Sequence, residues 1–168
     1  MIKAVLLDAD GVIQKTDAEF LEQLRALVPE NQDAFLTDVF TSEQPCAVGA
    51  KDFREQLKSV LSMWQVPEDV DQVLQIWQQI EVIPGLSNLL NKIKARGAVT
   101  GLATNQQSYR MNYMRQKLGY DGLFDFGFYS CELGAKKPQA EYFDAVVVAL
   151  GINANQCLFI DDSEPNVA

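Results

Sequence analysis

The chain has 168 residues, of which 48% are hydrophobic and 22% are charged, the balance of a soluble globular protein rather than of a disordered one. Its 23 acidic and 14 basic residues give a formal net charge of −9, so we expect neither nucleic acid nor a membrane surface as a partner. The sequence contains no histidine, which excludes Ser-His-Asp and Cys-His catalysis and the common zinc sites.

The first element is an apolar run over residues 2–7, which predicts a strand buried on both faces of a parallel sheet. The run is too short for a secretory signal, and no segment approaches the roughly 20 apolar residues of a membrane-spanning helix. Three scattered cysteines, Cys46, Cys131 and Cys157, have no paired spacing. We therefore expect reduced thiols and a cytoplasmic location.

The second segment, from Thr16 to Ile80, carries apolar residues at helical spacing, interrupted by prolines and glycine. This pattern predicts about four helices with no strand between them. Trp64 and Trp77 fall on the apolar stripes of these helices, which favours packing in a core over stacking on a ligand.

From Ile83 onward, helical and strand patterns alternate. We expect helices over 84–96, 108–118 and 138–150, and strands over 98–103, 126–129 and 157–160. The alternation predicts an α/β fold, a Rossmann-like doubly wound parallel sheet with a small all-helical cap inserted after the first strand. The expected domains are a core of residues 1–15 and 81–168 and a helical domain of residues 16–80.

Polar residues gather where the predicted strands end. In an open parallel sheet the carboxyl ends of the strands form the ligand-binding edge. Each group alone has an ordinary explanation as a turn, a helix cap or a solvated lysine, but their joint occurrence indicates one site. Lys136 is expected to be a solvated surface charge. The residues predicted to meet are Asp8, Asp10, Thr104, Asn105, Lys137, Asp161 and Asp162.

Carboxylates that converge on one site repel each other unless a cation joins them. A set of oxygen ligands selects a hard cation, and we expect Mg²⁺ as the cofactor.

Four motifs together resemble the haloacid dehalogenase-like hydrolases. These are the Asp-Ala-Asp-Gly-Val segment at 8–12, the Leu-Ala-Thr-Asn segment at 102–105, the Lys-Pro pair at 137–138 and the Phe-Ile-Asp-Asp-Ser segment at 159–163. The helical insertion is similar to the small cap of one branch of that family. Within that branch, the Ala-Thr-Asn and Lys-Lys-Pro runs look most like small sugar-phosphate phosphatases.

The resemblance implies a role for each carboxylate. Asp8 would be the nucleophile that forms an aspartyl-phosphate, and Asp10 the acid that protonates the leaving alcohol and then the base for water. Because a halide leaves without a proton, Asp10 favours phosphoryl transfer over carbon–halogen cleavage.

The remaining site residues would bind phosphate and metal. Thr104 and the backbone N–H of Asn105 would hold the phosphoryl oxygens, and Lys137 would neutralise the charge on them and on the nucleophile. The expected metal-binding residues are Asp8, Asp10, Asp162 and Asp161, with Asp162 favoured over Asp161 as a direct ligand.

The expected function is a Mg²⁺-dependent phosphatase acting on a small phosphorylated metabolite, with a sugar phosphate as one candidate. Two alternatives stay open: a phosphomutase of the same family, and a truncated, non-catalytic chain that serves as a binding or dimerisation module. Family members usually continue beyond the fourth motif, so we expect the strand at 157–160 to be an exposed edge. A homo-oligomer would cover it if the chain is not cut short.

Overall fold

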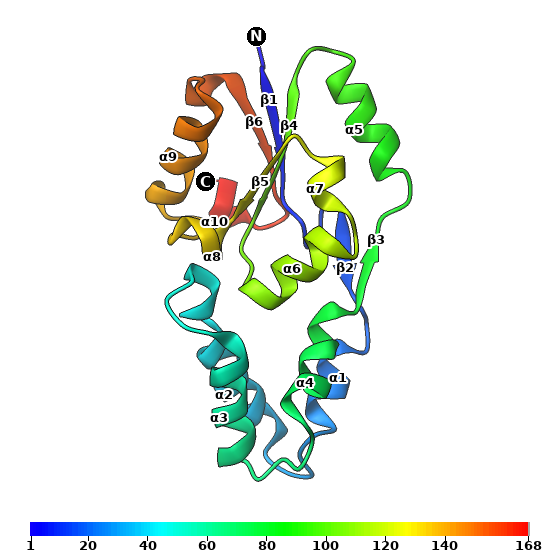
Figure 1. Ribbon diagram of the computed structural model, residues 1–168, viewed down its shortest axis with the longest axis vertical. Coiled ribbons are helices and arrows are strands. Elements are labelled where there is room, and N and C mark those ends of the chain that lie inside the picture. The colour runs from blue at the N-terminus through cyan, green and yellow to red at the C-terminus, as the bar shows by residue number, and fades with distance from the viewer. Residues whose placement is uncertain (168) are drawn as a thin grey trace.

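The computed structural model describes residues 1–167 and contains one four-stranded sheet, in the order β5-β4-β1-β6, in which all neighbouring strands are parallel (Figure 1). The strands are β1 (Ala4–Leu7), β4 (Val99–Thr104), β5 (Phe126–Tyr129) and β6 (Cys157–Ile160). The predicted α/β class is confirmed, and β5 and β6 have the expected bounds.

Helices cover both faces of this sheet, as the doubly wound prediction requires. On one face, Val5 and Leu7 pack against α5 (Leu86–Lys94), α6 (Ser108–Gln116) and α7 (Tyr120–Leu123). On the other, Leu6 and Ala103 pack against α9 (Ala140–Leu150), next to α8 (Ser130–Leu133). Neighbouring residues of a strand point to opposite faces, so a strand that is apolar throughout is buried on both sides.

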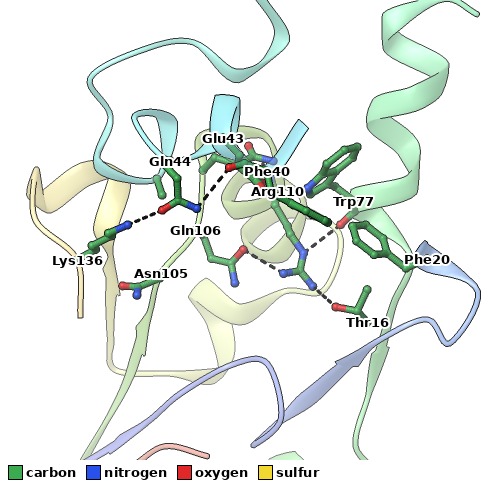
Figure 2. A pocket seen from close by; sticks show the side chains of 12 residues that line it. Thr16, Phe20, Phe40, Glu43, Gln44, Trp77, Asn105, Gln106, Arg110 and Lys136 are labelled. Atoms are coloured by element: carbon green, nitrogen blue, oxygen red, sulfur yellow. Dashed lines mark hydrogen bonds between the residues drawn. The ribbon is translucent and has the colours of Figure 1, made fainter. Parts of the chain in front are cut away.

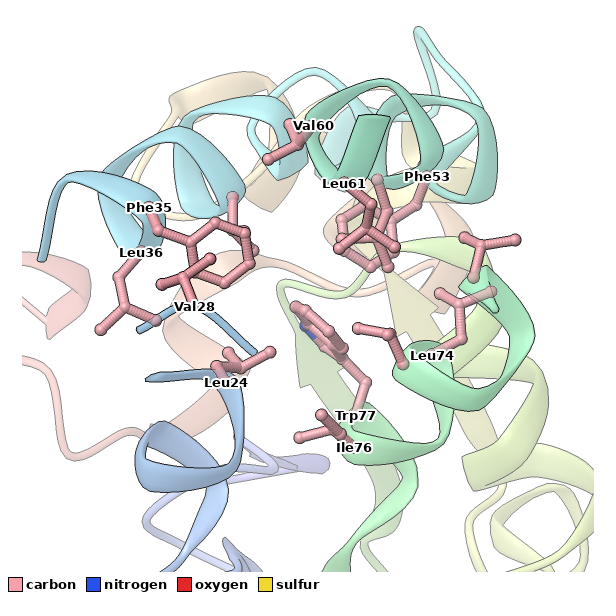
Figure 3. Packing of buried hydrophobic residues seen from close by; sticks show 14 of the residues in the cluster. Leu24, Val28, Phe35, Leu36, Phe53, Val60, Leu61, Leu74, Ile76 and Trp77 are labelled. Carbon is pink, nitrogen blue, oxygen red and sulfur yellow. The ribbon is translucent and has the colours of Figure 1, made fainter. Parts of the chain in front are cut away.

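Residues 20–78 form a separate bundle, called here the helical unit. It contains α1 (Phe20–Arg25), α2 (Gln32–Glu43), the 3₁₀ turn η1 (Cys46–Val48), α3 (Phe53–Met63), α4 (Val70–Leu74) and the 3₁₀ turn η2 (Gln75–Gln78). Its apolar stripes meet in a core of their own, in which Leu24, Phe35, Phe53 and Trp77 point toward one another (Figure 3).

Both tryptophans pack as predicted. The Trp77 ring lies edge-on to Phe20 and Phe53, with ring centroids 5.5 and 5.0 Å apart. The Trp64 ring lies edge-on to Phe35 at 5.6 Å, and its N–H donates to Asp38 over 2.9 Å. The indole of Trp64 thus joins the core while its polar atom finds a partner.

Two short strands were not predicted: β2 (Gln14–Thr16) and β3 (Ile80–Val82), which pair antiparallel. Three residues are too few to show a strand's alternation, so the sequence pattern gave no signal. These strands carry the chain into and out of the helical unit. The expected boundaries of the helical domain, at 15/16 and 80/81, fall within them.

Two further elements lie near the described end of the chain. The 3₁₀ turn η3 (Ala154–Gln156) precedes β6, and the expected helical turn at 165–168 is α10 (Glu164–Val167), with Ala168 outside the described residues. As expected, β6 is an edge strand in the described structure, and Leu158 and Ile160 are 46% and 42% exposed. In residues 1–167 no helix has the length and apolar character that crossing a membrane requires.

The separate core of the helical unit predicts that Leu57→Ala destabilises the protein. Leu57 is fully buried on α3, and a Leu→Ala change in a core costs about 2–5 kcal/mol. Urea denaturation followed by tryptophan fluorescence measures this loss, because both tryptophans lie in this unit. Met63→Ala on the same helix is the control, since Met63 is 62% exposed and its removal should cost less than about 0.5 kcal/mol. Equal losses in the two variants would contradict the packing.

Candidate active site

The register of the sheet explains why distant residues meet. Leu7 lies opposite Leu102 on one side and Ile160 on the other. The carboxyl ends of β1, β4 and β6 therefore lie at the same edge of the sheet. Asp8, Thr104 and Asp161 come from three adjacent strands in this way, as the sequence pattern predicts.

The centre of the site is the ammonium group of Lys137, whose side chain is 1% exposed. Its Nζ lies 2.8 Å from an oxygen of Asp8 and 2.5 Å from an oxygen of Asp161. Burial raises the pKa of Asp8 above its ordinary value, and the charge and hydrogen bond of Lys137 oppose that rise. A buried cation held between two carboxylates keeps all three groups in fixed positions.

Asp161 and Asp162 have different surroundings although they are neighbours. Asp161 accepts hydrogen bonds from Lys137, from the Ser163 backbone and from Asn166. Burial would raise the pKa of Asp161, but these hydrogen bonds hold it below its usual range. Asp162 is exposed, and we find no hydrogen bond to its carboxylate from residues 1–167. It is the carboxylate with oxygens free for a ligand.

One carboxylate oxygen from each of Asp8, Asp161 and Asp162 lies within 4.8 Å of the others, close enough for all three to approach one metal ion. Gly11 makes room for this cluster. Its φ is +82°, and a Cβ built there would lie only 2.1 Å from Asp162 Oδ2. Glycine is therefore required both by the turn and by the position of Asp162.

Thr104 and Asn105 line the cavity that also contains Asp8 and Asp162, but their side chains form different contacts. The Thr104 hydroxyl is within 3.1 Å of the Gln106 amide. The Asn105 side chain is used structurally, because its amide and carbonyl exchange two hydrogen bonds with the Lys137 backbone, 3.0 and 2.9 Å long. Asn105 thus holds the loop that carries Lys137.

Asp10 lies outside the carboxylate cluster. Its two oxygens accept hydrogen bonds of 2.6 and 2.8 Å from the Arg110 guanidinium, and Gln14 and Gln106 donate to it as well. Burial would raise the pKa of Asp10, but Arg110 and these amides hold it below its usual range. The side-chain geometry therefore gives no support to the prediction that the Asp10 carboxylate binds the metal.

Sequence reasoning missed Arg110, which is 9% exposed on α6. The sequence could have indicated its burial, because helical spacing places Arg110 on the same apolar face of the helix as Met111 and Met114. A cation on an apolar face has to find a buried partner. Lys136, predicted to be a solvated surface charge, donates a 2.6 Å hydrogen bond to Gln44 of the helical unit at the protein surface.

Two cavities adjoin at this edge of the sheet. The acidic cavity, of about 560 Å³, is lined by Asp8, Asp10, Lys137 and Asp162. The aromatic cavity, of about 320 Å³, lies between the sheet and the helical unit and is walled by Phe20, Phe40 and Trp77 (Figure 2). Thr16 and Asn105 line both, so the two cavities are adjacent.

The aromatic cavity also carries polar groups. Glu43 lines it, and burial raises the pKa of this carboxyl to about 7. Gln107, only 2% exposed, caps α6 through its carbonyl oxygen, and its side-chain amide lies beside the Glu43 carboxylate. Polar groups at the wall of a cavity are suited to polar ligand atoms.

Comparison with known proteins gives two informative relatives by sequence and one by structure. A phosphatase of Mycobacterium tuberculosis (strain CDC 1551) is 25% identical over 175 residues, covering 96% of this chain and 79% of the relative. The flavin mononucleotide hydrolase of Arabidopsis thaliana is 32% identical over 85 residues, which are 51% of this chain and only 34% of the plant protein.

Among solved structures, a haloacid dehalogenase family enzyme of Bacteroides thetaiotaomicron in complex with magnesium and inorganic phosphate superposes with a TM-score of 0.83. It is 23% identical, and the match covers 99% of this chain and 87% of that one. The family model for the haloacid dehalogenase-like hydrolases matches residues 2–168. The expectation from the four motifs is thereby confirmed: the chain belongs to the haloacid dehalogenase-like hydrolase family.

Proposed function

We propose that this hydrolase is a Mg²⁺-dependent phosphatase that acts on a small phosphorylated metabolite through an aspartyl-phosphate on Asp8. The observation that carries the proposal is the buried Lys137 between Asp8 and Asp161, with Asp162 beside them at one edge of the sheet. The phosphatase name of the mycobacterial relative and the magnesium and phosphate in the solved neighbour support it.

The three clustered carboxylates fit a magnesium ion, which prefers oxygen ligands. Asp8 and Asp162 would hold it directly, since Asp162 has no competing hydrogen bond in the described structure. Asp161, already bound by Lys137 and Asn166, would orient the site. When bound, the ion would offset the repulsion between these carboxylates and a phosphate dianion.

The first step transfers the phosphoryl group to the protein. A carboxylate oxygen of Asp8 attacks the phosphorus in line with the ester oxygen, and the bond between phosphorus and that oxygen breaks. The departing oxygen takes a proton from Asp10, whose acid form is disfavoured while Arg110 lowers its pKa and is favoured when the negative charge of a phosphate lies beside it. Lys137 stabilises the charge on the transferring group, and Thr104 and the Asn105 backbone N–H bind its oxygens.

The second step restores the protein. A water molecule attacks the phosphorus of the aspartyl-phosphate, gives a proton to Asp10 and breaks the bond to the Asp8 oxygen. Phosphate leaves, Asp8 is again a carboxylate, and Asp10 is again an acid. No histidine is needed, in agreement with the composition of the chain.

The helical unit would act as a cap over the leaving group. A phosphate bound in the acidic cavity would direct the rest of the substrate toward the aromatic cavity, because the two adjoin at Thr16 and Asn105. Glu43, Gln107 and Lys136 offer hydrogen bonds to hydroxyl groups, while the aromatic walls suit a flat apolar face. A sugar phosphate fits this lining better than a purely hydrocarbon phosphate.

Wild-type protein is expected to hydrolyse members of a panel of sugar and nucleotide phosphates when Mg²⁺ is present, with release of inorganic phosphate as the measurement. Asp8→Asn should lower the rate at least about 10³-fold, because an amide cannot form the aspartyl-phosphate. Wild-type turnover no higher than that of Asp8→Asn would contradict the proposal. A strict requirement for a bisphosphate activator would favour the phosphomutase instead.

Asp162→Asn is expected to raise the Mg²⁺ concentration needed for half-maximal activity by about 10–100-fold, since one charged ligand is lost. Glu164→Gln is the matched control, because Glu164 is an exposed carboxylate two residues away and outside the cluster. The titration of activity with Mg²⁺ separates the two variants. If both shift equally, overall charge rather than a ligand explains the effect.

A further inference from the structure

Arg110 uses its whole guanidinium group, and its partners come from three separate parts of the chain. Its two terminal nitrogens bind the two oxygens of Asp10. The same nitrogens reach Gln106 Oε1 at 3.2 Å and Thr16 Oγ1 at 3.1 Å, and Nε reaches the Trp77 carbonyl at 3.1 Å (Figure 2). These are five hydrogen bonds for five donors.

Two of these partners flank the connection to the helical unit. Thr16 is the last residue of β2, which leads into the unit, and Trp77 lies in η2, just before β3 leads out of it. Arg110 itself belongs to α6, which packs on the sheet. The guanidinium therefore joins both connecting segments to a fixed helix.

The remaining contacts hold Asp10 at the rim of the acidic cavity. Gln14, fully buried on β2, donates to Asp10 over 3.0 Å and accepts from the Tyr120 hydroxyl over 2.8 Å. Asp10 is thus fixed by Arg110 from one side and by β2 from another. A shift of β2 or η2 would change hydrogen bonds of the same guanidinium that binds Asp10.

We propose that Arg110 is a positioning residue that sets the direction of the Asp10 carboxylate and couples it to the two ends of the helical unit, through Thr16 of β2 and Trp77 of η2. The proposal rests on the proposed function, in which Asp10 exchanges a proton with the leaving oxygen. Arg110 contacts neither the nucleophile nor the carboxylate cluster, and it acts through Asp10. Its planar fork is suited to this task, since paired bonds to a carboxylate define an orientation that a single ammonium contact does not.

The test compares two esters that differ in their need for an acid. The alcohol of glycerol 2-phosphate leaves poorly without a proton, whereas p-nitrophenolate leaves readily. The ratio of kcat/KM for the two esters reports the transfer to Asp8 and is independent of the later hydrolysis step. Loss of acid assistance costs about 10²–10⁴-fold, and only for the poor leaving group.

We expect Asp10→Asn and Arg110→Gln to lower kcat/KM for glycerol 2-phosphate at least about 10-fold more than for p-nitrophenyl phosphate. The double variant should be no worse than Asp10→Asn, because residues that act through one group are not additive. Arg110→Lys should resemble Arg110→Gln, since the charge alone does not supply the fork. Full activity of Arg110→Lys, additive losses, or a faster reaction of Arg110→Gln would each overturn the proposal.

Arg115→Gln is the matched control. Arg115 is on the same helix and pairs with Glu132 and Asp121, away from both cavities. This variant should leave the ratio of the two esters unchanged.

Two measurements on another variant still test the proposal if Arg110→Gln does not fold. Thr16→Val removes one contact of Arg110 but leaves its pair with Asp10, and it should shift the ester ratio in the same direction by a smaller factor. Hydrogen exchange of the β2 and β3 amides should be faster in Thr16→Val than in Arg115→Gln. An unchanged ratio together with unchanged exchange would overturn the coupling.

If the wild type hydrolyses neither ester nor any other phosphate monoester with Mg²⁺, the proposed function fails instead.

Discussion

The arrangement of this site depends on one interaction, the burial of the Lys137 ammonium between Asp8 and Asp161. A cation taken out of water is costly unless its hydrogen-bonding capacity is used by charged partners of good geometry. Two carboxylates that face each other at this edge of the sheet would likewise repel. The lysine and the two aspartates therefore stabilise one another, and the carboxylate of Asp162 beside them accepts no hydrogen bond from residues 1–167.

A second buried ion pair separates the two aspartates of the first motif. Asp8 belongs to the Lys137 cluster, and Asp10, two residues later, belongs to Arg110. The turn at Gly11 makes this separation possible, because the chain reverses there and returns through Gln14 to the same side of Asp10. Two carboxylates close in sequence thus receive different electrostatic surroundings, with the pKa of Asp8 raised by burial and the pKa of Asp10 held down by Arg110.

The same pairs connect the site to the rest of the fold. The Asn105 side chain holds the Lys137 loop, so two hydrogen bonds between that side chain and the Lys137 backbone link the second and third motifs. Arg110 links Asp10 to β2 through Thr16 and to η2 through the Trp77 carbonyl. Two further hydrogen bonds join the helical unit to the rest of the fold. The Ser130 hydroxyl donates to the Ala47 carbonyl, and the Lys136 ammonium donates to the Gln44 side chain. The aromatic cavity lies between these contacts, at the place where a leaving group would be held.

The sequence by itself determined the fold class, most helices and the set of polar residues at the strand ends. Apolar runs such as residues 4–7 have few alternatives to a buried parallel strand, and the carboxyl ends of such strands share one edge. Only the tertiary structure decided which cation pairs with which carboxylate. Arg110 reaches Asp10 across 100 residues, and the short strands β2 and β3 exist only because they pair with each other. Such pairings depend on distances between remote segments, which local patterns of hydrophobicity and charge do not contain.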